Sequence, residues 1–428
     1  MNKCSPNRLI RLALPVVFLA LAVSVGKADD HKPHAEILHW WSTDGESAAL
    51  KVIIDAFESR GGIYYDSSKD NQVANRQEAI SRMGKGYPAS LTQWNAGNDL
   101  AELYDYGLIK PIDDSTIVHK LKTTLPASIL DTVTYKGKVI ALPLNVHVEN
   151  WLWYSYKHIN QPDVKLSGNW LEFLELGEAL SHNEVPLLAV GNQSWQVRIL
   201  FTSVFLGVSM HRFKDFYLTG DENVVDSHEF RTVLSVFNRL ARYSHSFGDG
   251  SWDSQVKAVA ENRAAGVFMG DWAKGEFMTH GMQAGEDYGC RLTSTDEPSL
   301  LVVIDALVLG KLEEKSARDG QKLMLDVVSD ANVSLDFNAL KGSVSPYAKP
   351  APSAMDTCDK QVYAAIDDEE AIIPPYHSYF SNVGEQIEYV DMVIDEFWNA
   401  SRQSNQNPAE LIEHAVEKFR SIIEHRED

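Results

Sequence analysis

Basic residues and cysteine are both scarce in this chain. Its 39 lysines and arginines are outnumbered by 60 aspartates and glutamates, which gives a formal net charge of −21. A charge of this sign argues against nucleic acid and anionic membrane surfaces as partners, because both require a basic face on the protein. A neutral ligand is indifferent to the charge, whereas an anionic ligand would be repelled unless a local basic pocket received it.

The short motifs of common catalytic and cofactor sites are also missing. The chain has no Gly-x-Ser-x-Gly elbow, no His-Glu-x-x-His zinc site, no Walker loop, no Gly-x-Gly-x-x-Gly turn and no EF-type calcium loop. We therefore expect a protein that is not an enzyme and that holds no cofactor and no metal.

Long hydrophobic runs are absent except at the N-terminus. Lys3, Arg8 and Arg11 precede an apolar run from Leu12 to Val25, which at 14 residues is shorter than the roughly 20 that span a bilayer. Small residues then end at Ala28, a suitable cleavage site. The sequence predicts a signal peptide over residues 1–28 and an exported protein, periplasmic if the host has two membranes. An uncleaved anchor is the alternative.

Removal of that segment would leave only two cysteines, Cys290 and Cys358. In an oxidising compartment two cysteines suggest one disulfide. It would close a loop of 68 residues, worth about 4 kcal/mol on the chain-entropy model. Two unpaired buried thiols are the alternative.

The roughly 400 remaining residues suggest two domains rather than one core. Strand and helix patterns alternate early in the chain, which indicates a parallel sheet covered by helices. We expect a helix capped by Asp44 and ended near Gly61, and a turn over residues 135–138. The other expected strands cover 36–41, 63–65, 89–93, 139–147, 265–269 and 300–309, and the other helices 73–83, 99–106, 170–182, 197–208, 230–243, 255–263, 316–329, 383–399 and 409–424.

Tryptophan is abundant, with ten residues, and most stand beside carboxylates, amides or glycines. An indole ring next to a fixed hydrogen-bond acceptor suits a sugar, whose C–H face stacks on the ring while its hydroxyls bond to polar side chains. Each tryptophan alone could equally be packing. Together they favour a carbohydrate site; those in such contexts are Trp40, Trp41, Trp94, Trp195, Trp252 and Trp272.

Six short segments follow one another in an order typical of one family. They are His39-Trp40-Trp41, Gln93-Trp94-Asn95-Ala96-Gly97, Leu142-Pro143-Leu144-Asn145-Val146-His147, Gly250-Ser251-Trp252, Phe268-Met269-Gly270-Asp271-Trp272 and Phe337-Asn338-Ala339-Leu340-Lys341-Gly342-Ser343. The chain resembles the extracellular solute-binding proteins of bacterial ABC sugar importers, the maltose-binding-like group, and looks closest to the branch that binds glucose and related monosaccharides.

The resemblance implies an α/β fold, a two-lobed periplasmic binding protein (type II-like) with crossing hinge strands and a ligand cleft between the lobes. Lobe 1 would comprise residues 35–145 plus about 300–345, and lobe 2 about 146–299 plus 346–428. Closure around the sugar would form the surface that the permease subunits in the inner membrane recognise. The protein is expected to be a monomer.

The resemblance also implies a set of ligand-binding residues. Trp41 and Trp252 would stack on the sugar, Asp305 would accept its hydroxyls, and Lys341 would donate to it. At Asn95 the relatives carry histidine, which bears on the hydroxyl that is read. The full set is Trp40, Trp41, Glu46, Gln93, Asn95, Asn145, His147, Trp252, Asp271, Trp272, Asp305, Lys341 and His377.

Each polar member of this set also has a structural alternative. A charge in the apolar run around Asp305 is costly unless it is paired, so a salt bridge to a structural base is possible. Lys341 could be a solvated loop residue and His147 a satisfied core histidine. Asp271 could brace the loop that carries Trp272.

The expected function is the capture of a neutral sugar, with a monosaccharide such as glucose as the expected ligand, and its delivery to an ABC importer. One alternative is an exported carbohydrate-active enzyme of the glycosidase kind, which would need two facing carboxyls. Asp44 with Glu46, or Asp249 with Asp253, are the candidate pairs. A second alternative is a sugar sensor that feeds a chemoreceptor.

Overall fold

The computed structural model describes residues 32–159, 170–294, 298–375, 383–403 and 406–424. Lys32–Asp428 forms one compact unit. The predicted signal peptide, residues 1–28, and His377 lie outside the described residues.

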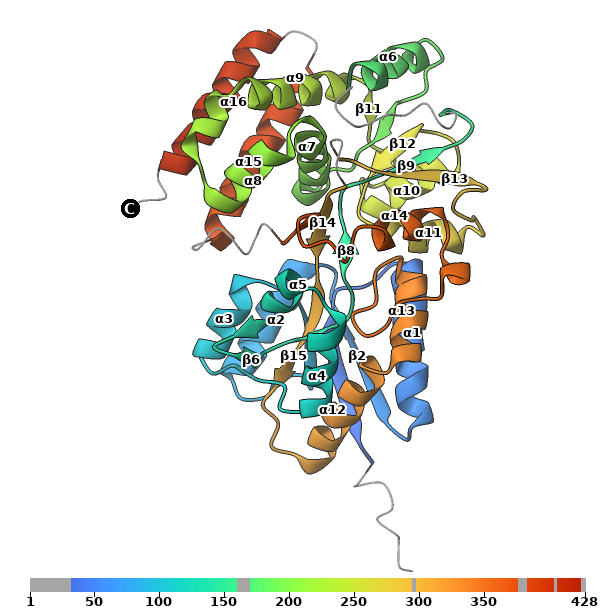
Figure 1. Cartoon of the computed structure of the whole chain (residues 1–428), viewed down its shortest axis with the longest axis vertical. Helices are drawn as coiled ribbons and strands as arrows, with labels where there is room; N and C mark the ends of the chain where they lie inside the picture. The colour runs from blue at the N-terminus through green and yellow to red at the C-terminus, as the bar shows by residue number, and fades with distance from the viewer. Residues whose placement is uncertain (1–31, 160–169, 295–297, 376–382, 404–405, 425–428) are drawn as a thin grey trace, which may run out of the picture. The chain divides into compact units, whose positions relative to one another are not determined.

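The first sheet has six strands and joins the early part of the chain to one late strand (Figure 1). Its order is β2-β1-β3-β15-β4, with β7 paired to β15. Only β1, β2 and β3 are mutually parallel, and β15 runs antiparallel to its neighbours. The expected parallel sheet is therefore only partly right. The strands are β1 (His34–His39), β2 (Ile63–Ser68), β3 (Leu91–Asn95), β4 (Ile109–Lys110), β7 (Leu142–Pro143) and β15 (Asp305–Gly310).

Helices cover this sheet, and the first shows why the sequence forms them. The helix begins with a capping box in which the Thr43 hydroxyl accepts from the Glu46 backbone N–H and the Glu46 carboxylate accepts from the Thr43 N–H. The expected cap, Asp44, is instead the first helical residue. The helices are α1 (Asp44–Ser59), α2 (Gln72–Gly84), α3 (Asn98–Asp105), α4 (Ser115–Thr124), α5 (Ala127–Asp131), α12 (Lys315–Val328) and α13 (Ala331–Lys341).

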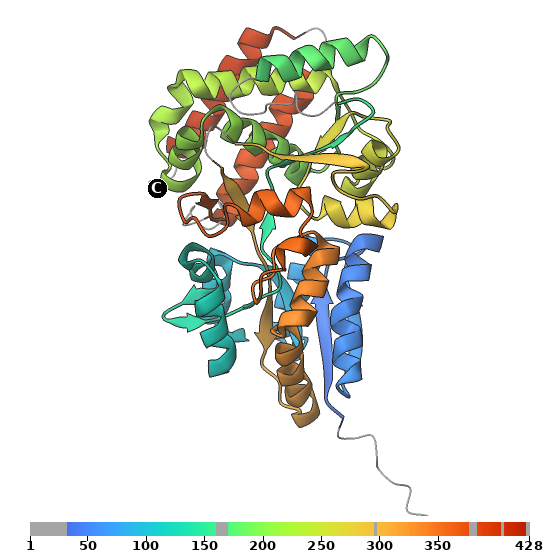
Figure 2. The ribbon, with the colours of Figure 1, turned by 45° about the vertical axis from the view of Figure 1, so that its right-hand side comes forward.

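The second sheet has the order β11-β10-β12-β9-β13. Figure 2 shows a helical layer beside it that includes the last helices of the chain. Its strands are β9 (Trp151–Ser155), β10 (Leu188–Ala189), β11 (Ser244–His245), β12 (Gly266–Phe268) and β13 (Tyr288–Leu292). The helices are α6 (Trp170–Ser181), α7 (Ser194–Val208), α8 (Met210–Lys214), α9 (His228–Arg242), α10 (Trp252–Ala260), α11 (Ala273–Thr279), α14 (Thr357–Tyr363), α15 (Val383–Ser401) and α16 (Pro408–Glu424).

The chain crosses between the two sheets through a small third sheet, in the order β16-β14-β8. Two expected strands are broken here. Residues 139–147 give β7 and then β8 (His147–Val148), and residues 300–309 give β14 (Leu300–Val303) and β15 with a break at Ile304. The break follows from the pairing, because β14 pairs with β8 and β16 (Ile372–Ile373) whereas β15 pairs within the first sheet.

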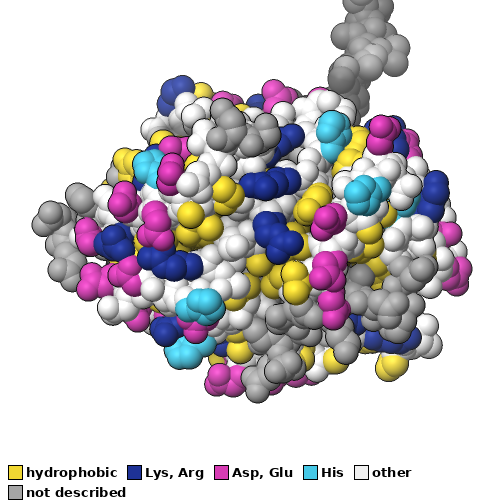
Figure 3. All heavy atoms as spheres, turned by 90° about the horizontal axis from the view of Figure 1, so that it is seen from above, with side chains coloured by type: hydrophobic (Ala, Val, Ile, Leu, Met, Phe, Trp, Pro, Cys, Tyr) yellow, Lys and Arg dark blue, Asp and Glu magenta, His cyan; other side chains and the backbone are white. Residues whose placement is uncertain are grey.

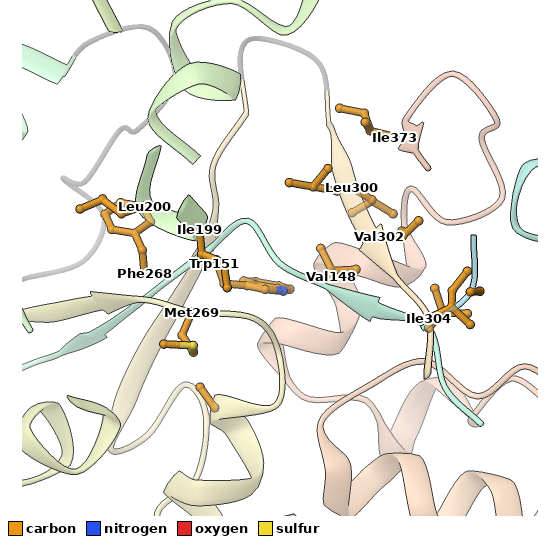
Figure 4. Close-up of a cluster of buried hydrophobic side chains, with 14 of the residues drawn as sticks. Val148, Trp151, Ile199, Leu200, Phe268, Met269, Leu300, Val302, Ile304 and Ile373 are labelled. Carbon is orange, nitrogen blue, oxygen red and sulfur yellow. The ribbon is translucent and has the colours of Figure 1, made fainter. Parts of the chain in front are cut away.

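Apolar side chains fill the core around the crossing (Figure 4). Trp151, Val148 and Ile304 lie among side chains from β12, β14, β16 and α7, and all are buried. The crossing strands are therefore held by burial as well as by a few backbone bonds.

The expected turn is a hairpin of β5 (Thr134–Tyr135) and β6 (Lys138–Val139). Lys136 and Gly137 both have positive φ, as a two-residue hairpin loop requires. The remaining helical turns are a π-helical one over Asp215–Thr219 and 3-10 turns over Glu222–Asp226 and Pro352–Ala354.

Cys290 and Cys358 form a disulfide with their Cα atoms 5.9 Å apart, so that prediction is confirmed. Among the described residues no helix is both long and apolar enough to cross a membrane. On the face shown in Figure 3, acidic and basic side chains are intermixed, so the net negative charge does not gather there.

Candidate functional site

Asp305, at the start of β15, lies at the centre of a buried polar network. The β3–β15 register places it opposite Asn95, whose Nδ2 donates to Asp305 Oδ1 at 3.3 Å. Asn145 donates from Nδ2 to Oδ2 at 3.2 Å, and its Oδ1 accepts from the Asp305 backbone N–H at 3.0 Å. Two amides thus fix the carboxylate in a side chain that is only 5 % exposed.

His147, on the first crossing strand, bridges two carboxylates. Its Nδ1 is hydrogen-bonded to Asp271 Oδ1, and its Nε2 lies 3.5 Å from Asp305 Oδ2. Burial alone would lower the pKa of His147, but the charges and bonds of Asp271 and Asp305 outweigh it and raise the pKa to about 9. The imidazole is therefore protonated at neutral pH.

The pKa of Asp305 moves in the opposite direction. Burial would raise the pKa of Asp305, but the hydrogen bond and charge of His147 outweigh burial and lower it, helped by the Lys341 ammonium. The buried carboxylate is therefore ionised and can accept hydrogen bonds.

Lys341, the last residue of α13, makes a second buried ion pair beside this network. Its Nζ lies 3.0 Å from Glu46 Oε1 and 5.3 Å from the centroid of the Trp41 ring. The other oxygen of Glu46 accepts from the backbone N–H groups of Ser42 at 3.0 Å and Thr43 at 3.3 Å. The capping box of α1 therefore also orients the partner of Lys341.

Indole rings border the network. Trp272 stands edge-on to the His147 ring, with centroids 5.2 Å apart, and Trp195 lies 6.1 Å from Trp272. Both indoles are partly exposed, so part of each ring is open to a ligand. Trp41 is buried beside Phe337 at 5.7 Å, and Trp94 is buried beneath Arg76.

Helix α11 meets α1 and α13 at two glycines. The Gly45 N–H in the first turn of α1 donates to Glu276 Oε1 of α11 at 3.1 Å. A Cβ on Gly45 would lie 2.7 Å from that oxygen, and a Cβ on Gly275 would lie 2.8 Å from the Leu340 carbonyl oxygen. Burial raises the pKa of Glu276, although hydrogen bonds from Thr43 and Gly45 oppose it.

The structure brings together most of the residues that the resemblance implied. Trp40 and Gln93 are hydrogen-bonded to each other, because the backbone N–H of Trp40 donates to Gln93 Oε1 at 3.1 Å. Trp252 begins α10, which packs on α11, and is half-buried. The residues joined in or beside the network are Trp41, Glu46, Asn95, Asn145, His147, Asp271, Trp272, Asp305 and Lys341.

The structure bears on two of the structural alternatives. One oxygen of Asp271 is hydrogen-bonded to His147 and the other accepts from the Val148 backbone N–H at 2.8 Å, so Asp271 braces the loop that carries Trp272, and its contact with a ligand stays a prediction. Lys341 is not a solvated loop residue, since its side chain is 3 % exposed.

One carboxylate of each pair proposed for a glycosidase, Glu46 and Asp249, is engaged in local structure. Glu46 holds Lys341 and the start of α1. Asp249 accepts from the Ser251 N–H and from the Ser254 hydroxyl, each at 3.0 Å. Among the described residues, no group of three or more His, Cys, Asp or Glu could hold a metal ion.

Three residues outside the expected ligand-binding set border this region, and one of them, Trp195, is among the tryptophans that favour a carbohydrate site. Gln72 donates to Asn95 Oδ1, Glu276 holds Gly45, and Trp195 faces Trp272. Only Trp195 had a local signal, the preceding run Gly191-Asn192-Gln193-Ser194. Gln72 and Glu276 lie in ordinary helical patterns, and only the fold reveals their positions.

No family model matches the chain. Curated relatives do. A probable sugar-binding periplasmic protein of Brucella melitensis is 26% identical over 372 residues, which cover 84% of this chain and 86% of the relative. An uncharacterized ABC transporter extracellular-binding protein of Pyrococcus horikoshii is 26% identical over 363 residues, covering 82% of this chain and 80% of that protein.

Solved structures show the same fold. The bacterial solute receptor AcbH, described as exclusively preferring β-D-galactopyranose, superposes with a TM-score of 0.71 at 16% identity, covering 91% of this chain and 97% of the receptor. The maltose-maltodextrin binding protein of Alicyclobacillus acidocaldarius gives a TM-score of 0.60 at 11% identity, covering 90% and 99%. The chain therefore has the α/β periplasmic-binding-protein fold of the maltose-binding type, and the predicted fold class is confirmed.

Proposed function

We propose, from the premise that the chain is an ABC-transporter solute-binding protein of the maltose-binding-like group, that it captures a neutral sugar and delivers it to an importer. The relatives are described as binding proteins, so the prediction that the chain is not an enzyme is confirmed. We expect the sugar to leave the protein chemically unaltered.

One observation carries the proposal: polar side chains from separate elements converge on Asp305, beside the partly exposed indole of Trp272. Asn95 comes from the first sheet, His147 from the crossing, and Trp272 from the loop that follows the second sheet's β12. A carboxylate held by amides and an imidazolium still has lone-pair capacity for a hydroxyl, and the indole offers a face for the sugar's C–H groups.

The charge of the site favours an uncharged ligand. Three carboxylates, Glu46, Asp271 and Asp305, stand against two cations, His147 and Lys341, so no cation is left unpaired, even though burial raises the pKa of Asp271 against the charge of His147. A sugar phosphate or a uronic acid would find no spare cation in this buried setting to offset its charge. We therefore propose that anionic sugars are rejected.

The proposal also covers the size of the ligand and the compartment in which the protein acts. We infer a monosaccharide such as glucose, and a single-ring ligand is consistent with the description of AcbH as a galactopyranose receptor. The Brucella relative is described as periplasmic, and we propose the periplasm for this chain, with the inner-membrane permease as partner and the two lobes divided as the sequence predicted.

Isothermal titration calorimetry of the mature protein tests the proposal. The panel is glucose, galactose, maltose, glucuronate and glucose 6-phosphate, and mass spectrometry afterwards checks that each ligand is intact. We expect binding of a neutral monosaccharide with Kd about micromolar or tighter, near −8 kcal/mol, and no binding of either anion. Preferential binding of an anion, or recovery of a cleaved sugar, would refute it.

A further inference from the structure

A buried lysine lies in the first turn of α11, directly after the loop that carries Asp271 and Trp272. Lys274, in α11, places its Nζ 2.6 Å from Asp356 Oδ2 and 2.6 Å from Asp359 Oδ1, and its side chain is 9 % exposed. Both carboxylates belong to the start of α14. Because an ammonium this deeply buried is costly unless it is paired, Lys274 and α14 must keep a fixed spacing.

The helix that supplies these carboxylates is anchored independently. Cys358, in the first turn of α14, is disulfide-bonded to Cys290 of β13, and Gln361 donates to the Cys290 carbonyl at 3.2 Å. Cys290 pairs with Trp153 of β9, and its strand β13 is the last strand of the second sheet. The disulfide thus ties α14 to the sheet, and α14 in turn holds Lys274.

The backbone carries this restraint from Lys274 to the site. The Lys274 N–H donates to the Asp271 carbonyl at 2.9 Å, and the Asp271 N–H donates to the Val148 carbonyl at 3.0 Å. A narrow crevice is lined by Asp271, Lys274, Cys358 and Asp359, among other residues. The site residue Asp271 and the disulfide cysteine Cys358 therefore border the same small space.

We infer that Lys274 is a positioning residue for the site and that the Cys290–Cys358 disulfide acts through it, by holding Asp271 against His147 and Trp272 beside the ligand. The link to sugar affinity rests on the proposed function, whereas the link to His147 does not. The alternative hypothesis is that the disulfide only stabilises the fold as a whole.

The His147 imidazole provides a readout that global stability does not move. Its pKa of about 9 depends on contact with Asp271 and Asp305. NMR of protein labelled at histidine Cε1, with the His147 signal identified by its loss in His147→Gln, measures that pKa without any ligand. Reduced wild-type protein, Lys274→Met and Lys274→Arg are compared with oxidised wild type.

If Lys274 positions Asp271, reduction and Lys274→Met each move the pKa of His147 down toward 6.5, and Lys274→Arg restores most of it. Sugar affinity, measured by calorimetry, falls about tenfold in the first two, the loss of roughly one charge-assisted hydrogen bond. Lys349→Met, which breaks the exposed pair with Asp367, is the matched control and changes neither quantity.

The inference is overturned if the His147 pKa stays near 9 in the reduced protein and in Lys274→Met while Tm falls. Circular dichroism checks that each variant is folded at the temperature of the titration; if Lys274→Met is not, the reduced wild type decides. If oxidised wild type binds no sugar, the proposed function fails, but the pKa comparison still decides the role of Lys274.

Discussion

Raising the pH should destabilise this protein through one buried side chain, His147. The imidazolium is enclosed between Asp271 and Asp305, and the three groups are all buried. Above its pKa the ring is neutral and loses the attraction of at least one carboxylate. We expect the folded state to lose stability in alkaline solution, and His147→Gln to remove most of that dependence.

The size of the effect follows from the pKa of His147, raised from 6.5 to about 9. Each unit is worth about 1.4 kcal/mol, so the contribution to the free energy of unfolding is about 3 kcal/mol. Because the folded-state pKa is the higher one, this stability is fully present below pH 6.5. It is lost progressively as the pH rises, and it has gone above about 9.

Urea unfolding followed by circular dichroism measures the effect at pH 6.5, 8 and 9.5. The pKa of Glu149 is raised to about 7 by burial, against the opposing charge of Arg198, so its own pH dependence falls almost entirely below the upper two points. Because the charge of His147 also lowers the pKa of Glu149, the comparison of wild type with His147→Gln uses the change in stability between pH 8 and 9.5, where the loss of the His147 charge dominates. Parallel stability curves for the two proteins would refute the reasoning.

Three further substitutions probe the site and its frame. Asp305→Asn keeps the shape but replaces one oxygen with a donor facing the amide of Asn95 or Asn145, so calorimetry should show sugar affinity reduced about tenfold or more with unchanged circular dichroism. Trp252→Ala should weaken binding by a similar factor, about tenfold, if the indole stacks on the ligand; an unchanged Kd would remove it from the site. Gly342→Ala, at φ +85° and with its Cβ placed 2.2 Å from the Asp271 carbonyl oxygen, should lower the urea-derived stability by about 1–3 kcal/mol.

Local chemistry made much of the fold predictable from the sequence. The early strands and helices were predicted because the apolar periodicity of each segment stops where the element ends, as it does for α2 and α3. The true cap of α1 was also readable, since Thr43 and Glu46 have the spacing of a capping box. Asp44 was preferred because aspartate caps helices well on its own.

The break at Ile304 could not be read from the sequence. Residues 300–309 form one apolar run, and periodicity cannot show that its two halves pair in different sheets. The polar signal was Asp305 itself, whose backbone N–H is taken by the side chain of Asn145. That pairing joins residues 160 positions apart in the chain, which no local rule can supply.

In the candidate site, too, local sequence signals were readable and long-range contacts were not. Single residues such as His147 and Lys341 were identified through the resemblance. The pairings between them were not, because the contact of His147 with Asp271 and that of Lys341 with Glu46 depend on the packing of distant elements. The same limit applies to Lys274, which in the sequence is one more lysine in a short helix.

The two glycines at which α1 meets α11 are suitable positions for engineering the affinity of the protein. Because neither Gly45 nor Gly275 carries a side chain, atoms of α1, α11 and α13 approach one another closely there. Inserting a graded series of bulkier residues at either position would act as a spacer of adjustable thickness. A fluorescent reporter built on this scaffold could in that way be tuned to a chosen concentration range without altering any residue of the polar network.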